Sequence, residues 1–153
     1  MTKEAGTTKP AQLADFPVVV TVPIQWGDQD AIGHVNNTRC FLWYETARVR
    51  YLEKCDLPTN AHGGAVAPIL AAISCNYKLQ LNYPDTVHIG ARISRIRRSS
   101  ITMDYAVYSE SLDAIAADGD STVVVFDYES NRPVRVPEEI RDVIRKLEDK
   151  PDL

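Results

Sequence analysis

Residues 26–37 read WGDQDAIGHVNN, and residues 38–52 read TRCFLWYETARVRYL. The first stretch is polar and contains Gly and Asn, which favours a turn followed by the cap of a helix. The second stretch repeats apolar residues at helical spacing. Its apolar stripe consists of Cys40, Trp43, Tyr44, Ala47, Tyr51 and Cys55, widened by Phe41 and Leu52. We therefore expect a long helix over about residues 37–55, whose wide apolar face suits wrapping by a sheet or burial against a partner subunit.

The start of this helix is the first candidate for a functional site. The first turn of a helix carries unpaired N–H groups and the positive end of the helix dipole, which suit an anion or an oxygen that gains negative charge. Asp30 lies a few residues upstream, and we expect its carboxylate to face a cleft beside the first turn. Asp28 is its natural competitor, but it is expected to bond to the local backbone. Glu45 and Arg48 are three residues apart, so we expect an ion pair between them.

The segments outside this helix carry strand and turn signals. Residues 18–24 are rich in β-branched residues, and Pro23 places this strand at a sheet edge or at a bulge. At least the second half of residues 66–77 is expected to be a strand. Apolar and polar residues alternate over residues 87–93 and again over 101–107, which predicts two half-buried strands.

Residues 114–128 form one long strand, or two strands joined at residues 118–120, where Gly119 indicates a bulge. Pro137 favours the first position of a final helix. Successive strands joined by short turns make an antiparallel sheet, and one long helix must cover its face. The fold class is therefore α+β, with a sheet curled around the helix.

Length and composition exclude several classes of protein. The 153 residues are 44% hydrophobic and 25% charged, which is typical of a single globular domain. We expect residues 1–13 to form a disordered leader and residues 14–153 to form the domain. A net charge of −4 gives no reason to expect a nucleic acid or a membrane as the partner. With no secretory or membrane-spanning segment, we expect a cytoplasmic protein.

The cysteines and histidines are spaced too widely for a disulfide framework or a metal site. We expect buried free thiols in a reducing compartment and no bound metal. These residues are Cys40, Cys55 and Cys75, and His34, His62 and His88.

The octet of residues 30–37 is similar to the Asp-x-x-Gly-His-Val-Asn-Asn motif of hotdog-fold thioesterases, specifically the 4-hydroxybenzoyl-CoA thioesterase and acyl-CoA thioesterase family. The helical pattern Tyr44-x-x-Ala47-Arg48 also matches, and the resemblance extends from Val18 to Leu147. It implies a hotdog fold, in which a curled antiparallel sheet wraps one long central helix and a short C-terminal helix follows. It also implies hydrolysis of an acyl-CoA thioester by a homodimer whose sheets join edge to edge, and such dimers often pair into tetramers.

The resemblance implies roles for five residues of the octet. Asp30 aligns with the catalytic carboxylate, which acts as a general base or as a nucleophile. Backbone N–H groups near Asn36 and Asn37 polarise the thioester carbonyl, while the two side chains also serve as helix caps. Gly33 occupies a position that tolerates no Cβ near the substrate, and His34 orients the loop or hydrogen-bonds near the substrate.

Two further groups of side chains are weaker candidates. Another branch of hotdog thioesterases carries its catalytic acid on the helix, where Glu45 lies in this chain. Arginines on and after the strand at residues 87–93 are candidates for holding the phosphates of coenzyme A. They are Arg95, Arg97 and Arg98, together with Arg92. Related chains often carry Gly near Arg97, so this turn departs from the family pattern. Coenzyme A is part of the substrate, and no cofactor is expected.

Other functions remain open at this point. Hydrolysis of acyl carrier protein thioesters is a close variant, which the acidic charge of this chain weakly disfavours. A hotdog hydratase or dehydratase needs an acid–base pair whose spacing Asp30 and His34 do not reproduce well. A hotdog protein that only binds acyl groups is the third class. The sequence does not determine which acyl group is preferred.

Overall fold

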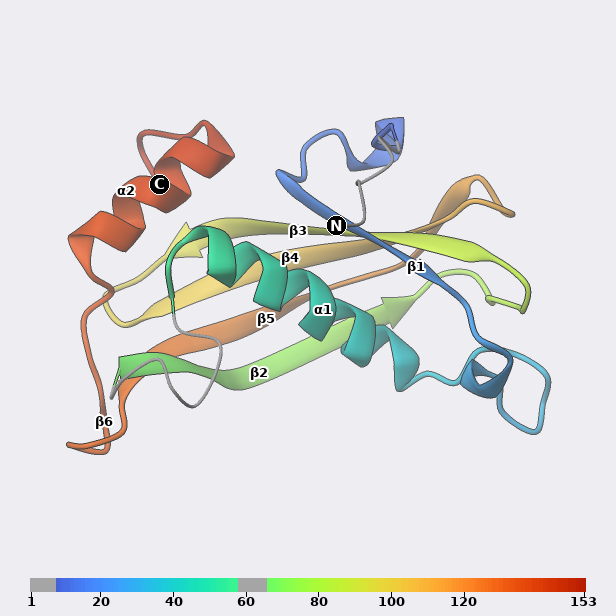
Figure 1. Ribbon diagram of the computed structural model, residues 1–153, viewed down its shortest axis with the longest axis horizontal. Coiled ribbons are helices and arrows are strands. Elements are labelled where there is room, and N and C mark those ends of the chain that lie inside the picture. Colours follow the sequence, from blue (N-terminus) through green and yellow to red (C-terminus); the bar gives the residue numbers. More distant parts are fainter. Residues whose placement is uncertain (1–7, 58–65) are drawn as a thin grey trace, which may run out of the picture.

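The computed structural model describes residues 8–57 and 66–153 and has an antiparallel sheet curled around one long helix (Figure 1). Its strands are β1 (Val18–Pro23), β2 (Val66–Tyr77), β3 (Thr86–Ile96), β4 (Ser100–Ser109), β5 (Ala114–Asp127) and β6 (Arg132–Pro133). The helices are α1 (Arg39–Lys54) and α2 (Glu138–Glu148), with short 3-10 helices η1 (Ala11–Leu13) and η2 (Trp26–Asp28). The strands follow the order β1-β3-β4-β5-β2, and β6 pairs with β5. The predicted α+β class and hotdog architecture are confirmed.

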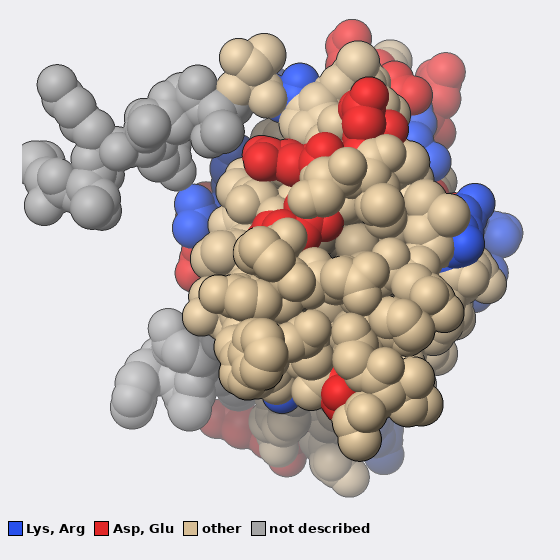
Figure 2. All heavy atoms as spheres, turned by 90° about the vertical axis from the view of Figure 1, so that its right-hand side faces the viewer, with Lys and Arg blue, Asp and Glu red and all other residues tan. Residues whose placement is uncertain are grey.

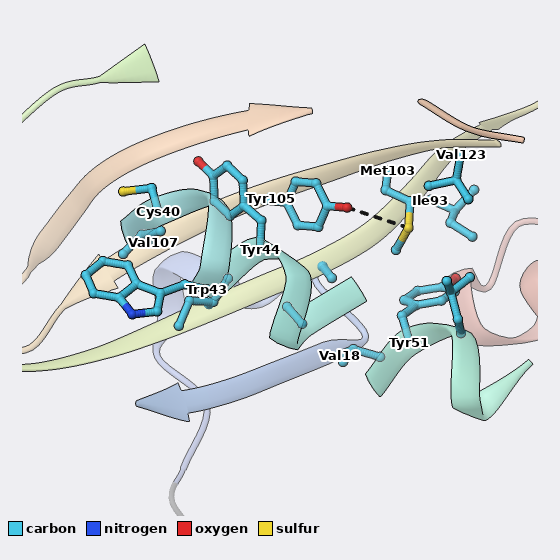
Figure 3. Packing of buried hydrophobic residues seen from close by; sticks show 14 of the residues in the cluster. Val18, Cys40, Trp43, Tyr44, Tyr51, Ile93, Met103, Tyr105, Val107 and Val123 are labelled. Carbon is cyan, nitrogen blue, oxygen red and sulfur yellow. Dashed lines mark hydrogen bonds between the residues drawn. The ribbon is translucent and has the colours of Figure 1, made fainter. Parts of the chain in front are cut away.

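Helix α1 holds the core because its apolar stripe faces the sheet. The side chains of Trp43, Tyr44 and Tyr51 lie between the helix and the strands (Figure 3). Tyr44 stacks on Tyr105 of β4 with 4.5 Å between the ring centroids. Aromatic pairs of this kind add to the stabilisation that comes from burial alone. The stripe predicted from the helical spacing is buried, from Cys40 to the residue that follows the helix, Cys55.

Arg48 corrects one expectation about α1. The expected ion pair with Glu45 is not formed within the described residues. Arg48 is buried, and its Nη1 donates to the hydroxyl of Tyr105 at 3.3 Å. The same hydroxyl lies 2.7 Å from Ser121 Oγ. Glu45 is exposed. An arginine can bury its apolar stem and place its charged end at a polar partner. The partner of Arg48 lies on β4, so helical spacing alone did not identify it.

The two edge strands differ in how well the sequence predicted them. Strand β1 pairs only with β3, which confirms that Pro23 stands at a sheet edge. Strand β2 is the opposite edge and covers the whole of residues 66–77, which includes the second half that was predicted as a minimum. Most of the side chains of β2 are exposed, including large apolar ones such as Leu70 and Tyr77.

Strand β5 is continuous, and its bulge is not at Gly119. The pairing with β4 shifts between Ala117 and Ile115, which leaves Ala116 as the extra residue. Gly119 instead allows a close approach of β2, since a Cβ at that position would lie 2.0 Å from the backbone oxygen of Ser74. Gly119 is therefore explained by the close contact between β2 and β5, and the bulge of β5 occurs at Ala116 instead.

The two ends of the chain pack against the sheet. Helix η1 lies within the segment that was expected to be disordered, and Leu13 is fully buried beside Phe16. The packed domain therefore begins before residue 14. At the other end, Pro137 is the N-cap of α2 rather than its first residue. Glu148 Oε1 accepts hydrogen bonds from the hydroxyl of Tyr51 and from the backbone N–H of Ile93, both at 2.6 Å, which ties α2 to α1 and β3.

Candidate active site

The motif of residues 28–36 folds into a tight hairpin that leads into α1. The N–H of Asp30 donates to the carbonyl of His34 at 2.9 Å, and the N–H of Asn36 donates to the carbonyl of Asp28 at 2.8 Å. Gly33 closes the turn by donating to the carbonyl of Asp30. Its φ of 89° lies in a region that residues with a Cβ rarely adopt. The glycine of the motif is therefore explained by the turn itself.

The carboxylate of Asp30 does not enter a cleft within one chain. Its Oδ1 accepts the N–H of Ile32 at 2.9 Å, and the side chain is exposed. Oδ2 has no protein donor among the residues that the structure describes. One oxygen thus fixes the orientation of the carboxylate, while the other remains available. The expectation that Asp30 faces a cleft beside the helix is not met by the isolated chain.

Asp28 has the local role that was expected of it. Its Oδ2 accepts the N–H of Gln25 at 2.7 Å, and its Oδ1 lies 3.3 Å from Nε of Arg39. Arg39 also donates to the carbonyl of Gly27. Asp28 therefore connects the two sides of the hairpin to the first residue of α1 and is occupied by these contacts.

The start of α1 is held by Asn36 and by a tyrosine from the edge strand. Asn36 Oδ1 accepts hydrogen bonds from the N–H and the hydroxyl of Thr38, at 2.9 and 2.6 Å. The N-cap of α1 is Thr38 and has no side-chain cap bond, so Asn36 orders the turn before the helix and is not the cap that was expected. The hydroxyl of Tyr77 donates to the carbonyl of Asn37 at 2.6 Å. Within the described residues, the backbone N–H of Asn37, which lies one residue before the N-cap Thr38, has no acceptor.

A pocket of about 180 Å³ opens beside this helix start. Its polar side is formed by His34, Asn36 and Asn37. Its apolar side is formed by Cys40, Leu81, Ala116 and Ala117, and Tyr77 and Leu79 lie at the exposed margin. Together with Val35, the structure therefore gathers four residues of the motif at one pocket. Sequence reasoning missed two further parts of the pocket lining. Residues 77–81 form the end of β2 and the segment after it, and residues 116–117 lie within β5. Only the folded sheet brings these residues to α1.

The two buried thiols, Cys40 beside the pocket and Cys55 after the far end of α1, are poor nucleophiles. Burial raises the pKa of Cys40 to about 12, and the neighbouring thiol of Cys75 adds to the effect. Burial likewise raises the pKa of Cys55 to about 12. Since the thiolate is the reactive form of cysteine, neither side chain supplies a nucleophile at neutral pH. Both are free thiols, as the sequence predicted.

The three arginines proposed to hold phosphates lie away from this pocket. All three are exposed: Arg95 lies near the end of β3, and Arg97 and Arg98 lie in the β3–β4 turn. Strand β3 runs from its pairing with Pro23, next to the motif hairpin, to this turn at the other end of the sheet (Figure 1). The backbone carbonyls of Arg97 and Arg98 both accept hydrogen bonds from the buried Arg141 of α2. One chain therefore does not bring the arginines and the motif together.

The end of the molecule that carries the hairpin exposes few charges. Figure 2 looks at this end and shows mainly uncharged residues, with acidic side chains gathered in its upper part. Trp26 is 73% exposed and Ile32 is 80% exposed, and Trp26 packs edge-on against Tyr83. In the described segments, neither helix is long and apolar enough to cross a bilayer. No three potential metal-binding side chains come together there, although His62 lies outside the described residues.

A curled sheet around one helix, with a pocket at the start of that helix, defines the hotdog class of proteins. The family model of the thioesterase-like superfamily matches residues 24–144. The chain belongs to this superfamily.

Solved structures with the same fold support this assignment. A thioesterase from Thermus thermophilus, complexed with coenzyme A and zinc, is 33% identical, with a TM-score of 0.79 over 90% of this chain and 99% of its own. The PA5185 protein from Pseudomonas aeruginosa is 29% identical, with a TM-score of 0.77 over 88% and 94%. A gentisyl-coenzyme A thioesterase is 20% identical, with a TM-score of 0.73 over 82% and 98%, and this likeness concerns the fold alone.

Proposed function

We propose that this protein hydrolyses acyl-CoA thioesters, using Asp30 and the start of α1. The observation that carries the proposal is the backbone N–H of Asn37, which has no acceptor within the described residues and belongs to a residue that lines a mainly apolar pocket, in a member of the thioesterase-like superfamily. Attack on a thioester moves negative charge onto the carbonyl oxygen. A fixed N–H at the positive end of a helix stabilises that charge, and such a donor contributes about 10²–10³ in rate.

Asp30 either activates the attacking water or attacks the thioester itself. As a general base, it takes a proton from a water molecule while the water oxygen bonds to the carbonyl carbon. The carbon–sulfur bond then breaks, and the proton passes to the leaving thiolate to give free coenzyme A and a carboxylic acid. As a nucleophile, Asp30 bonds to the carbonyl carbon, and the carbon–sulfur bond breaks, so that coenzyme A leaves as a thiolate that takes up a proton. Water then hydrolyses the anhydride to the carboxylic acid and restores the carboxylate of Asp30. The hydrogen bond between Asp30 and Ile32 leaves one carboxylate oxygen available for either route.

A second copy of the chain completes the site in this proposal. If the β2 strands of two copies pair in an antiparallel arrangement, the two copies point in opposite directions. The turn that carries Arg95, Arg97 and Arg98 in the second copy then lies at the same end as the motif hairpin of the first. These arginines would hold the phosphates of coenzyme A, and Asp30 would face a cleft formed by both copies. The protein then acts as a homodimer, with no metal or separate cofactor.

The central experiment measures thiol release from a panel of acyl-CoA substrates, with wild type and Asp30→Asn. We expect wild type to release coenzyme A and Asp30→Asn to lose about 10²–10⁴ in kcat/KM, the usual contribution of a general base. Glu45→Gln is the matched control because Glu45 is the other candidate acid and is exposed on α1. It is expected to retain activity, and a chelator is expected to have no effect.

The alternatives have distinct outcomes. Thiol release from acyl carrier protein thioesters alone would redirect the proposal to that substrate. Hydration of an enoyl-CoA without thiol release would indicate a hydratase, and binding without turnover would indicate an acyl-binding protein. Equal loss in Asp30→Asn and Glu45→Gln would contradict the assignment of Asp30. A single turnover in ¹⁸O water separates the two routes, since only the nucleophilic route labels Asp30.

A further inference from the structure

The end of strand β2 is fixed to β5 at the bulge. Tyr77 is the last residue of β2 and pairs with Ala117 of β5. The carbonyl of Ala116, the extra residue of the bulge, accepts the N–H groups of Lys78 and Leu79 at 2.9 and 3.0 Å. A bulge takes one residue out of the regular ladder, and here its carbonyl holds two donors of the neighbouring segment. The backbone that carries Tyr77 is therefore held by β5 both at this residue and directly after it.

This segment contacts the motif at two points. The carbonyl of Leu81 accepts the N–H of Val35 at 2.8 Å. The hydroxyl of Tyr77 donates to the carbonyl of Asn37 at 2.6 Å, where the end of β2 meets the start of α1 (Figure 1). The first bond joins two backbone groups, so it does not depend on the type of side chain at residue 81. The second bond depends on one hydroxyl group, which makes the identity of Tyr77 decisive for this contact.

Hydrogen bonds hold the peptide groups on both sides of Asn37. A peptide group is planar, so a bond to its carbonyl oxygen also restricts the direction of its N–H. The carbonyl of Asn36 shares a plane with the N–H of Asn37, and it accepts the N–H of Arg39 at 3.0 Å. In the next plane, the N–H of Thr38 donates to Asn36 Oδ1 at 2.9 Å, and the carbonyl of Asn37 accepts the hydroxyl of Tyr77. Of these three bonds, the one from Tyr77 connects Asn37 to the sheet.

We infer that Tyr77 is a positioning residue for thioester hydrolysis, because its hydroxyl anchors Asn37 to β2 and so keeps the backbone N–H of Asn37 directed at the substrate carbonyl oxygen. This inference rests on the proposed function. A donor to a developing oxyanion is effective only when its direction is set before the reaction. A misplacement of about 1 Å costs about 10² in rate. A water molecule in place of the hydroxyl is not attached to β2, so it leaves Asn37 freer to rotate.

The test compares thiol release by wild type and by Tyr77→Phe, which removes the hydroxyl and keeps the ring. The substrate is the acyl-CoA that wild type hydrolyses fastest. We expect kcat to fall about tenfold to a hundredfold and KM to stay within about twofold, because the anchored N–H acts on charge that forms in the transition state. Tyr128→Phe is the matched control. Tyr128 is 52% exposed, compared with 51% for Tyr77, and its hydroxyl has no hydrogen bond in the described segments. Tyr128→Phe is expected to keep both constants.

A third variant tests whether the donated hydrogen bond itself matters. Tyr77→4-aminophenylalanine replaces the hydroxyl by an amino group, which also donates from the end of the ring. This variant is expected to recover kcat to within about fivefold of wild type. Circular dichroism and sedimentation check that every variant is folded and assembled as wild type is. A loss in Tyr77→Phe that disappears at high protein concentration would overturn the inference, since the hydroxyl would then act on the pairing of copies.

Hydrogen exchange tests the anchor without turnover. The N–H groups of Thr38 and Arg39 are both bonded to Asn36, in the turn that Tyr77 supports. Their protection in Tyr77→Phe is expected to fall about tenfold relative to wild type, because the turn opens more often. The N–H of Val35 is bonded to the carbonyl of Leu81 and is the internal control. Its protection is expected to be unchanged.

The outcomes separate this inference from the proposed function. Absence of thiol release from every substrate would reject the function, and hydrogen exchange would still decide whether Tyr77 anchors Asn37. Wild-type kcat in folded Tyr77→Phe, or a raised KM at constant kcat, would overturn the inference and leave the function in place. Unchanged protection of Thr38 and Arg39 would also overturn it.

Discussion

Asp85 joins three segments of the chain through a set of hydrogen bonds near the motif. Its carboxylate accepts from the hydroxyl groups of Ser109 and Ser111 and from the backbone N–H groups of Thr86 and Ser111. Its carbonyl accepts the N–H of Ile24, which precedes the motif. Burial alone would raise the pKa of this carboxyl. The hydrogen bonds outweigh burial and hold the pKa of Asp85 below its ordinary value.

We expect Asp85→Asn to lower the free energy of unfolding by about 2 kcal/mol at pH 7, since hydrogen bonds to a charged group contribute about 1.5–3 kcal/mol. The lowered pKa means that the folded state favours the ionised carboxylate. This stabilisation is full above the unfolded pKa of about 3.9, and it is lost as the pH falls through the lower folded pKa. Urea unfolding of wild type and variant at pH 7 and at pH 3 measures it. The difference between them should shrink at pH 3.

Asp15→Asn is the control for this prediction, because Asp15 is an exposed acid near the N-terminus. It is expected to change the free energy of unfolding by less than about 0.5 kcal/mol at either pH. A difference between wild type and Asp85→Asn that is equal at pH 7 and pH 3 would show that the charge of Asp85 is not the source of the stabilisation.

At the scale of single residues, the sequence predicted local contacts better than distant ones. The backbone bond of Asp28 follows from a neighbour three residues away, and the structure has it, whereas Asn36 forms a local turn with Thr38 and is not the N-cap. The partner of Arg48 is a hydroxyl on β4, which no helical spacing indicates. The orientation of Asp30 depends on its bond to Ile32 and, in the proposal, on a second copy of the chain. Residue type and spacing carry no information about that copy.

At the scale of the elements, the close approach of β2 and β5 depends on Gly119. A Cβ there would overlap the backbone oxygen of Ser74, so the two strands would have to separate. We expect Gly119→Ala to lower the free energy of unfolding by about 1–3 kcal/mol or more, as overpacking does. Because β2 also carries Tyr77, thiol release should fall as well. Urea unfolding and the activity assay measure the two effects.

Gly27→Ala is the matched control for Gly119→Ala. A Cβ on Gly27 would meet no atom within 4 Å, and its backbone does not need a glycine. This variant is expected to unfold within about 0.5 kcal/mol of wild type. Equal stability of the two variants would contradict the role assigned to Gly119.

The elements that the sequence predicted best are those with one buried face. Alternation identified β3 and β4, and helical spacing identified α1, because one side of each is apolar. For strand β2, only the second half was firmly predicted, since its apolar residues lie on exposed or half-buried positions of an edge. The bulge at Ala116 has no local signal, because alanine fits a strand and a bulge equally. The part of the pocket lining formed by Ala116 and Ala117 could therefore not be predicted from the sequence pattern.

At the scale of the whole molecule, β2 is a long edge strand with exposed apolar side chains. Ile69, Leu70 and Tyr77 are 39%, 42% and 51% exposed. Natural proteins usually pair, cover or charge an edge of this kind, because its free backbone groups attract another strand. This exposure supports the proposal that two copies of the chain join along β2.

We expect Leu70→Lys to convert a dimer to a monomer and to abolish most thiol release, because a charge on the edge strand opposes pairing. Sedimentation of wild type and variant measures the assembly and also distinguishes dimers from tetramers. Leu112→Lys is the control, since Leu112 is 45% exposed in the turn between β4 and β5. A dimer that survives Leu70→Lys would place the interface on another surface.

The hydroxyl of Tyr77 has a consequence for how the rate would depend on protein concentration. Tyr77 is the last residue of the edge strand β2, and its hydroxyl donates to the carbonyl of Asn37, just before α1 begins. Separation of two paired copies would release the strand on which that support stands. Dilution would therefore remove the arginines of the second copy and, at the same time, weaken the support of the start of α1. A plot of rate against protein concentration would then curve upward instead of following a straight line.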